Sequence, residues 1–254
     1  MRRCCLLGVV LALSGSLVAA EQITVAAAAD LNYALTELAS KFEALSGARV
    51  VLSFGSSGNL FSQIQNGAPF DLFFSADEEY PKKLAAAGVV DGATLRTYAV
   101  GHLVLWVPGN SAVDPEKLHM DLLTQASVTR VAVANPQHAP YGRAAMATLE
   151  HFGLKDKITG KLVFGESVSQ AAQFVQSGNA QAGLIALSLA KSPAMASGKY
   201  WEVPTDAYPE MRQAAVVVSA SKQKKLAQAF LDYVVSPEGE AVLRKFGLTP
   251  PAKP

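Results

Sequence analysis

Short apolar segments with strand character alternate with amphipathic helical segments along almost the whole chain, and this alternation restricts the fold more than any other feature. In the first part of the chain, strands are predicted at 23–30, 50–54 and 71–74, and apolar residues recur at helical spacing after each. Repeated strand–helix alternation is typical of a mainly parallel sheet with helices on both faces. The sequence therefore predicts an α/β fold.

The same alternation starts again near residue 103. Apolar character and turn residues predict further strands at 103–107, 130–134, 162–164, 182–186 and near 216–218, with helices at about 143–152 and 168–175. Two amphipathic helices finish the chain. The last one begins at Ser236 and Pro237, because serine is a favoured N-cap and proline is favoured at the first helical position.

Two lobes, with the second inserted into the first, fit this layout better than one large sheet. We expect a signal peptide at 1–20, lobe 1 at 21–102 plus 213–254, and lobe 2 at 103–212. The chain would cross between the lobes near 98–105 and again near 205–215. A single doubly wound domain is the alternative that the chain length leaves open.

The first 20 residues differ in character from the rest. Arg2 and Arg3 precede an apolar run from Cys4 to Val18, and small residues end the segment before Glu21. A basic start, a short apolar stretch and small residues at the junction are typical of a secretory signal peptide. The alternative is a membrane anchor, but the apolar run is short for a membrane-spanning helix. We therefore expect a periplasmic protein.

Cleavage after residue 20 would remove both cysteines of the chain, so the mature protein would have no disulfide, thiol nucleophile or thiolate metal ligand. It would also lower the Lys+Arg count from 22 to 20 against 21 Asp+Glu, giving a formal charge of −1. No basic cluster suggests nucleic acid or a membrane surface as partner. The four histidines lack metal-ligand spacing, so we expect no cofactor and no bound metal cation.

Four predicted strand-to-helix junctions share small and hydroxyl-bearing residues, two in each lobe: 28–30, 54–59, 139–142 and 165–168. Helix starts offer free backbone N–H groups and a partial positive charge, which together bind anions. In open α/β sheets such junctions face the crevice where ligands bind. The alternative is that the serines and Asp30 are ordinary N-caps. Four junctions from two lobes favour a shared anion site.

The chemistry of these junctions indicates which anion would fit. Arg143 is the only basic residue close to them, and we interpret it as a helix-surface residue. A site made of donors alone suits a fully deprotonated tetrahedral dianion, whereas phosphate near neutral pH carries a proton and needs an acceptor as well. The Asp30 carboxylate could accept that proton or cap its helix, and we favour the cap.

Several segments of the chain resemble the periplasmic molybdate-binding proteins of ABC transporters, the ModA family, which has the type II periplasmic binding fold. The most specific are Gly-Ala-Pro-Phe-Asp-Leu-Phe-Phe-Ser-Ala-Asp at 67–77 and Asn-Pro-Gln-His-Ala-Pro-Tyr-Gly at 135–142. The strand at 23–29, the turn at 53–57 and the tail at 230–239 extend the resemblance over the mature chain. The resemblance implies two lobes with the ligand in the cleft between them.

The resemblance also implies ligand positions. Ser57 would donate from its hydroxyl and amide groups, and Val168 from its backbone N–H. Tyr141 falls where family members use a backbone N–H or a tyrosine hydroxyl, and Asp30 occupies a position that is serine in many members. Ala186 stands where many members have a ligand tyrosine, so that hydroxyl is missing here and Tyr141 is the candidate to replace it.

We therefore expect an extracytoplasmic, monomeric solute-binding protein, not an enzyme, that captures molybdate or tungstate and delivers it to the permease of an ABC transporter. Sulfate or phosphate is the alternative ligand within this class. An enzyme on the same two-lobed fold, with a cysteine-tethered cofactor, would need a cysteine that the mature chain lacks. A transcription-factor sensing domain would need a DNA-binding motif before the lobes, where the sequence has an export signal instead.

Overall fold

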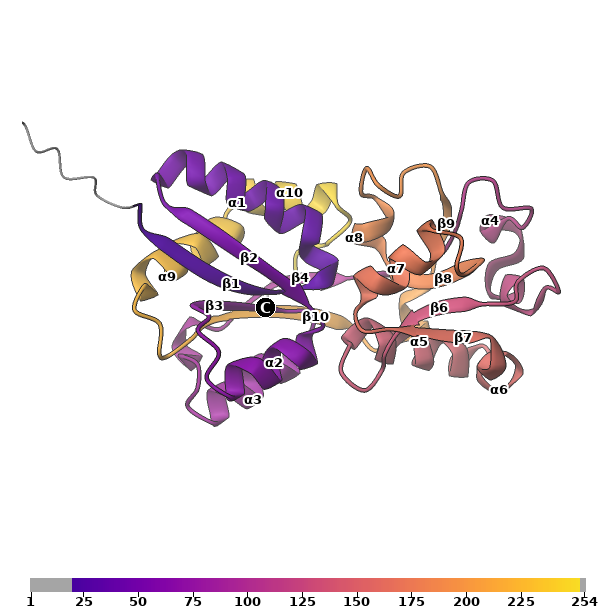
Figure 1. Ribbon diagram of the computed structural model, residues 1–254, viewed down its shortest axis with the longest axis horizontal. Coiled ribbons are helices and arrows are strands. Elements are labelled where there is room, and N and C mark those ends of the chain that lie inside the picture. Colours follow the sequence, from indigo (N-terminus) through magenta and orange to yellow (C-terminus); the bar gives the residue numbers. More distant parts are fainter. Residues whose placement is uncertain (1–19, 252–254) are drawn as a thin grey trace, which may run out of the picture.

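The computed structural model describes residues 20–251, and the predicted signal peptide lies outside this range except for its last residue (Figure 1). Two five-stranded sheets form two lobes. Sheet 1, the basis of lobe 1, contains β1 (Gln22–Ala28), β2 (Arg49–Gly55), β3 (Leu72–Ser75), β4 (Arg96–Gly101) and β10 (Met211–Val217). Sheet 2, the basis of lobe 2, contains β5 (Leu103–Val107), β6 (Val131–Ala134), β7 (Leu162–Gly165), β8 (Ala182–Ala186) and β9 (Lys199–Glu202).

The two sheets have the same construction. Their strand orders are β2-β1-β3-β10-β4 and β7-β6-β8-β5-β9. In each sheet the first three strands are parallel, and the fourth runs antiparallel to both of its neighbours. That fourth strand, β10 or β5, is the one that the chain enters on arriving from the other lobe. The two-lobed α/β fold is confirmed, and the crossing strands make each sheet mixed.

Helices cover both faces of sheet 1. They are α1 (Asn32–Ser46), α2 (Ser57–Gln65), α3 (Glu79–Ala86), α9 (Lys224–Val234) and α10 (Pro237–Lys245). Figure 1 shows α1, α9 and α10 on one face and α2 with α3 on the other. Neighbouring strand residues serve opposite faces. Phe74 belongs to the apolar core under α1 and α9, and Phe73 belongs to the core under α2 and α3.

Lobe 2 has a similar layered arrangement. Its helices are α4 (Pro115–Leu118), α5 (Pro140–His151), α6 (Lys155–Ile158), α7 (Val168–Gln176) and α8 (Leu187–Ala190). The longer two, α5 and α7, lie on opposite faces of sheet 2 (Figure 1). Buried aliphatic residues of β5, β6 and β8 form one continuous core with them. Among the described residues, no helix has the length and apolar character needed to cross a membrane.

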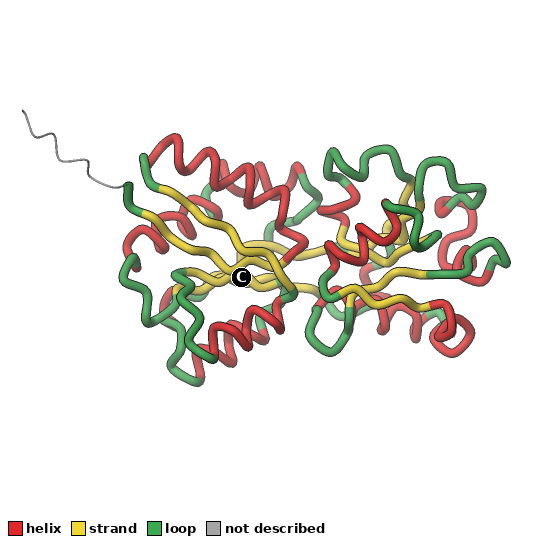
Figure 2. Tube along the Cα trace, viewed as in Figure 1, coloured by secondary structure: helices red, strands yellow, loops and turns green. Residues whose placement is uncertain are grey.

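The chain crosses between the lobes twice. The first crossing joins β4 to β5 at Gly101 and His102, and the second follows β9 and leads through 203–210 into β10. In Figure 2 the strands of both sheets run along the long axis toward the junction of the lobes. The helix starts that follow the parallel strands are therefore directed at this junction.

Some elements differ from the sequence-based expectation. The helix predicted from Arg143 already begins at Pro140, because Ala139 is its N-cap and proline occupies the first helical position. The strands β4 and β9 were not predicted. Both lie at a sheet edge, where exposed polar residues interrupt the apolar pattern.

Candidate ligand-binding site between the lobes

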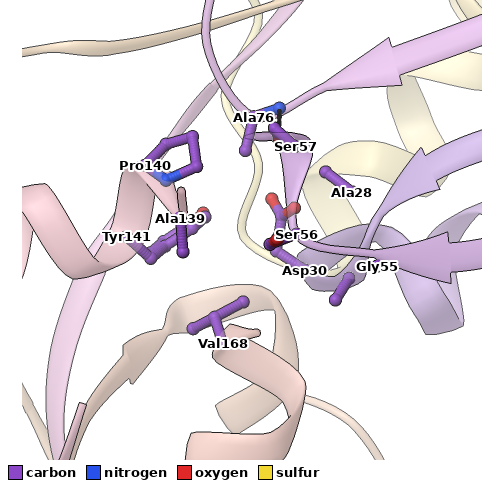
Figure 3. Close-up of a pocket in the computed structure, with 11 residues that line it drawn as sticks. Ala28, Asp30, Gly55, Ser56, Ser57, Ala76, Ala139, Pro140, Tyr141 and Val168 are labelled. Carbon is purple, nitrogen blue, oxygen red and sulfur yellow. Dashed lines mark hydrogen bonds between the residues drawn. The ribbon is translucent and has the colours of Figure 1, made fainter. Parts of the chain in front are cut away.

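A small cavity lies where the lobes meet (Figure 3), with about 190 Å³ of space not filled by atoms, part of which is open to solvent. All four predicted junctions contribute to it, together with the residue that follows β3. The residues that line it are Ala28, Ala29, Asp30, Gly55, Ser56, Ser57, Ala76, Ala139, Pro140, Tyr141 and Val168. The four residues predicted as ligand positions, Asp30, Ser57, Tyr141 and Val168, are thus brought together from two lobes.

The start of α2 supplies the most complete donor set. Ser56 is the N-cap, and its Oγ accepts the backbone N–H of Asn59 at 3.3 Å. Ser57 is the first helical residue and is 1% exposed, and its Oγ accepts the N–H of Ala76 at 2.9 Å. Because that bond occupies a lone pair and not the proton, the Ser57 hydroxyl keeps its O–H to donate to a ligand.

Lobe 2 directs two further helix starts at the cavity. Pro140 has no N–H, so Tyr141 carries the first free amide of α5. Val168 is the first residue of α7, after the N-cap Ser167, whose Oγ accepts the N–H of Gln170 at 3.3 Å. The first N–H groups of a helix have no partner within it. Figure 3 shows Tyr141 and Val168 on the side of the cavity opposite Ser57.

Asp30 does not cap a helix, and the interpretation favoured from the sequence is wrong on this point. It lies in the short 3-10 helix η1 (Ala29–Leu31), and neither η1 nor α1 has a side-chain cap. The carboxyl group is 1% exposed, and its Oδ2 accepts the Gln213 amide at 2.7 Å. The sequence could not reveal this, because Gln213 comes from β10, far along the chain.

Two tyrosines complete a buried polar network around Asp30. The Tyr98 hydroxyl donates to Gln213 Oε1 at 2.8 Å, and Gln213 Nε2 also lies 3.4 Å from the Tyr141 hydroxyl. Burial raises the pKa of Asp30 from 3.8 to about 6, and the nearby polar groups of Gln213 and Tyr141 lower the pKa by a smaller amount. Burial, followed by the nearby Asp30 charge, raises the pKa of both tyrosines well above 10.0, so they keep their protons.

Contacts beside the cavity hold the two lobes together. Gly58 donates its N–H to the His138 carbonyl oxygen at 2.8 Å, and Ser56 Oγ lies 2.9 Å from His138 Nδ1. Arg143 forms an ion pair with Asp77. These bonds join α2 and the β3–α3 loop of lobe 1 to α5 and its preceding loop in lobe 2. The structure therefore shows the lobes closed over the cavity.

Among the residues that the structure describes, no positively charged side chain lines the cavity. Arg143 does not line it, and its guanidinium group stacks on Tyr80 with 5.5 Å between the Arg143 Cζ and the ring centre. Within residues 20–251, no group of His, Cys, Asp and Glu side chains could hold a metal ion. The donors are hydroxyl and amide groups at helix starts, which favour a small anion with several acceptor oxygens.

Comparison with known proteins agrees with this geometry. The family described as bacterial extracellular solute-binding protein matches residues 23–249. The chain belongs to this family. The prediction of a solute-binding protein rather than an enzyme is thereby confirmed.

Several relatives in the family are molybdate-binding proteins by name. The chain is 40% identical to the molybdate-binding protein ModA of Azotobacter vinelandii over 229 residues, which is 90% of each protein. It is 36% identical to ModA of Rhodobacter capsulatus, over 90% of this chain and 88% of that one. The predicted resemblance to this group is confirmed.

Solved structures extend the comparison to the fold. The periplasmic molybdate-binding protein of Azotobacter vinelandii superimposes with a TM-score of 0.83 and 35% identity, covering 90% of this chain and 99% of that one. The sulfate-binding protein SubI of Mycobacterium tuberculosis superimposes with a TM-score of 0.72, 18% identity, and coverage of 91% and 88%. At that identity the second match supports the fold alone.

Some residues of the site were not foreseen. Ala76 lines the cavity, and its position directly after a short buried strand, within the 67–77 motif, could have indicated this. Gln213 and Tyr98 gave no signal, since a glutamine and a tyrosine in strands are ordinary residues. Ala186 is fully buried and is not among the lining residues, so no hydroxyl reaches the cavity from that position.

Proposed function

We propose that this protein captures molybdate outside the cytoplasm and delivers it to the permease of an ABC importer. Tungstate, with the same charge and tetrahedral shape, is proposed to bind as well. The observation that carries the proposal is the meeting of helix starts from both lobes, with Ser57, Tyr141 and Val168, around one small cavity. The relatives named as molybdate-binding proteins support the choice of anion.

Each proposed contact follows from a group described above. Ser57 offers its O–H and its backbone N–H, and the amides of Tyr141 and Val168 approach from the opposite side. A fully deprotonated dianion has acceptors only, so a cage of donors matches it. The positive ends of α2, α5 and α7 stabilise its charge.

Binding would shift an equilibrium between open and closed forms. The open form loads the anion on lobe 1, and closure adds the amides of lobe 2, so only the closed form makes every contact. We propose that residues 21–102 with 213–254 move against 103–212 about the two crossings. The permease would then recognise the closed, loaded form.

The cellular setting is part of the same proposal. The segment at 1–20 would act as a cleaved signal peptide, and the mature protein would work as a periplasmic monomer. The relatives support a location outside the cytoplasm, because the matching family is described as extracellular.

Phosphate is the second candidate ligand, and the position of Asp30 favours it. An ionised carboxylate in the cavity could accept the proton that phosphate carries near neutral pH. The 15–18% identity to the sulfate-binding and sugar-phosphate-binding structures shows the fold alone and supports neither anion.

Isothermal titration calorimetry of the mature protein with molybdate, tungstate, sulfate and phosphate tests the proposal. We expect tight, one-to-one binding of molybdate and tungstate and much weaker binding of the other two. Saturation by phosphate together with no heat from molybdate would overturn the choice of ligand.

A further inference from the structure

An unpartnered acid oxygen lies in the cavity. Asp30 lines the cavity and is 1% exposed, and its Oδ2 atom is engaged by the Gln213 amide at 2.7 Å. Within residues 20–251, no hydrogen bond reaches its Oδ1 atom. Figure 3 draws this carboxyl group between the lobe 1 residues and Tyr141. Leaving a buried acceptor without a partner costs free energy, so we expect Oδ1 either to contact a ligand or to carry a proton.

The surroundings of Asp30 carry no compensating positive charge. Gln213 of β10 and Tyr141 of α5 face the carboxyl group, and Tyr98 of β4 lies behind Gln213. From α8, Ser188 donates to the Asp30 backbone carbonyl at 2.7 Å. In the described part of the chain, no basic side chain contributes to the pKa of Asp30.

A charged pair close to this network is already satisfied. Asp77 contributes to the raised pKa of Tyr98 but not to that of Asp30, and Arg143 forms an ion pair with Asp77. An ionised Asp30 beside a doubly charged oxyanion would therefore face strong repulsion, because the buried carboxyl group is poorly screened by solvent. A protonated Asp30 would instead provide one more donor.

We propose that Asp30 binds the oxyanion as the neutral acid, donating a hydrogen bond from its Oδ1 hydroxyl to a ligand oxygen, so that ligand capture takes up one proton. The inference rests on the proposed function and deepens it. In the overall binding reaction, the Asp30 carboxylate takes a proton from solvent when the dianion enters, and it returns the proton when the dianion leaves. No bond of the oxyanion is broken.

The raised pKa of Asp30, about 6, agrees with this geometry. At a pH below that value the free protein already holds the proton, and binding takes up little. At higher pH the ligand must bring the proton in, so affinity for the dianion falls by up to tenfold per pH unit. The same acid selects against phosphate, because a protonated Asp30 cannot accept the phosphate proton.

Calorimetry of the mature protein with molybdate tests the proposal. Titrations at about pH 6 and about pH 8, each in two buffers with different heats of ionisation, give the number of protons taken up. We expect uptake approaching one proton at the higher pH and about half a proton at the lower pH, where the free carboxyl group is already half protonated, and an affinity at least tenfold weaker at the higher pH. This measurement needs no variant.

The Asp30→Asn variant provides the matched comparison. Its amide oxygen can accept from Gln213, as Oδ2 does, and its amide N–H can donate where the protonated Oδ1 would. We expect binding that no longer changes with pH and no proton uptake. Asp30→Asn changes no other titratable group, so a pH dependence that persists in the variant would overturn the assignment to Asp30.

The Asp91→Asn variant is the control for Asp30→Asn. Asp91→Asn removes a carboxylate at the start of the 3-10 helix η2 (Gly92–Thr94) and leaves a capping side chain, so it should keep the pH dependence of the natural protein. Molybdate binding without proton uptake would overturn this inference and leave the proposed function standing. No molybdate binding at either pH would overturn both.

Discussion

Gly58 in lobe 1 and the His138 carbonyl group in lobe 2 approach so closely that no side chain fits between them. The Gly58 N–H donates to the His138 oxygen at 2.8 Å, and a Cβ atom on Gly58 would lie 2.6 Å from that oxygen. It would also lie 2.6 Å from the Tyr80 hydroxyl. The closed arrangement of the lobes therefore depends on the absence of a side chain at this position.

We expect Gly58→Ala to hinder closure without harming the fold. Within lobe 1 the Tyr80 side chain must shift to make room for the methyl group, but alanine is favoured over glycine within α2, so we expect little change in the free energy of unfolding. The anion would lose most contacts from lobe 2, and because affinity falls with the fraction of closed protein, we expect a loss of at least about tenfold. Calorimetry measures the affinity, and small-angle scattering with saturating molybdate measures closure.

Gly160→Ala is the matched control for Gly58→Ala. Nothing lies within 4 Å of a Cβ built on Gly160, so that variant should bind and close as the natural protein does. Unchanged affinity and scattering in Gly58→Ala would mean that the lobes adjust to the methyl group at little cost.

The ion pair between Arg143 and Asp77 should contribute modestly to closure. The two side chains are 38% and 16% exposed, so solvent weakens the interaction to about 1 kcal/mol or less, with a similar addition from the stacking on Tyr80. We expect Arg143→Met to bind roughly 3–10-fold more weakly, mainly through faster dissociation.

A double-mutant cycle separates the two contributions of Arg143. Asp77→Asn alone, and combined with Arg143→Met, gives the coupling energy of the ion pair, and stopped-flow mixing with molybdate gives the dissociation rate. A coupling energy of zero together with an unchanged dissociation rate would show that this pair plays no part in holding the closed form.

Ser57→Ala should weaken binding more than Arg143→Met does. The variant loses a hydrogen bond to a charged ligand, which corresponds to about 1.5–3 kcal/mol, or about 10–150-fold in affinity. It also leaves the Ala76 N–H without the acceptor that it has at 2.9 Å, so the ligand-free protein should lose about 1–3 kcal/mol of stability.

Comparison with Ser236→Ala separates the two effects of the Ser57 change. Ser236 caps α10 by accepting the Gly239 N–H at 3.2 Å, and its loss should lower stability by about 1 kcal/mol without changing affinity. If Ser57→Ala behaved in the same way, with stability reduced and affinity intact, Ser57 would be only a structural acceptor for Ala76.

The fold and the place of the site were predictable because they depend on local patterns. Apolar runs and helical spacings located most long elements, and Gly47, with φ of 71°, ends α1 in the left-handed conformation that glycine favours. Strand-to-helix junctions gave the cavity, since parallel strands direct the following helix starts to one edge of a sheet.

The environment of Asp30 could not be predicted in the same way. Its partner Gln213 is 183 residues away in sequence, and it reaches Asp30 only because β10 returns from lobe 2 into the middle of sheet 1. The local sequence shows only an acidic residue before a helix, and the usual role of such a residue is to cap the helix. When a strand enters a sheet from the other lobe and pairs antiparallel, no local sequence pattern shows which of its side chains will reach the site.

The stability of the ligand-free protein should also report on the Asp30 carboxyl group. Because its pKa in the folded protein is raised from 3.8 to about 6, the stabilisation from the neutral acid is fully present below about pH 4 and is lost as the pH rises to about 6. Above that pH the burial of the charge costs roughly 3 kcal/mol.

Asp30→Asn removes this cost and keeps an acceptor for Gln213, so we expect the variant to be more stable than the natural protein at about pH 7, by up to about 3 kcal/mol, with little difference near pH 4. Urea unfolding of both proteins at these two pH values measures the change. If the variant were less stable than the natural protein at about pH 7, or if the difference in stability were the same at both pH values, the carboxylate would be stabilised as an ion. Protonation of Asp30 would then not control the stability of the site.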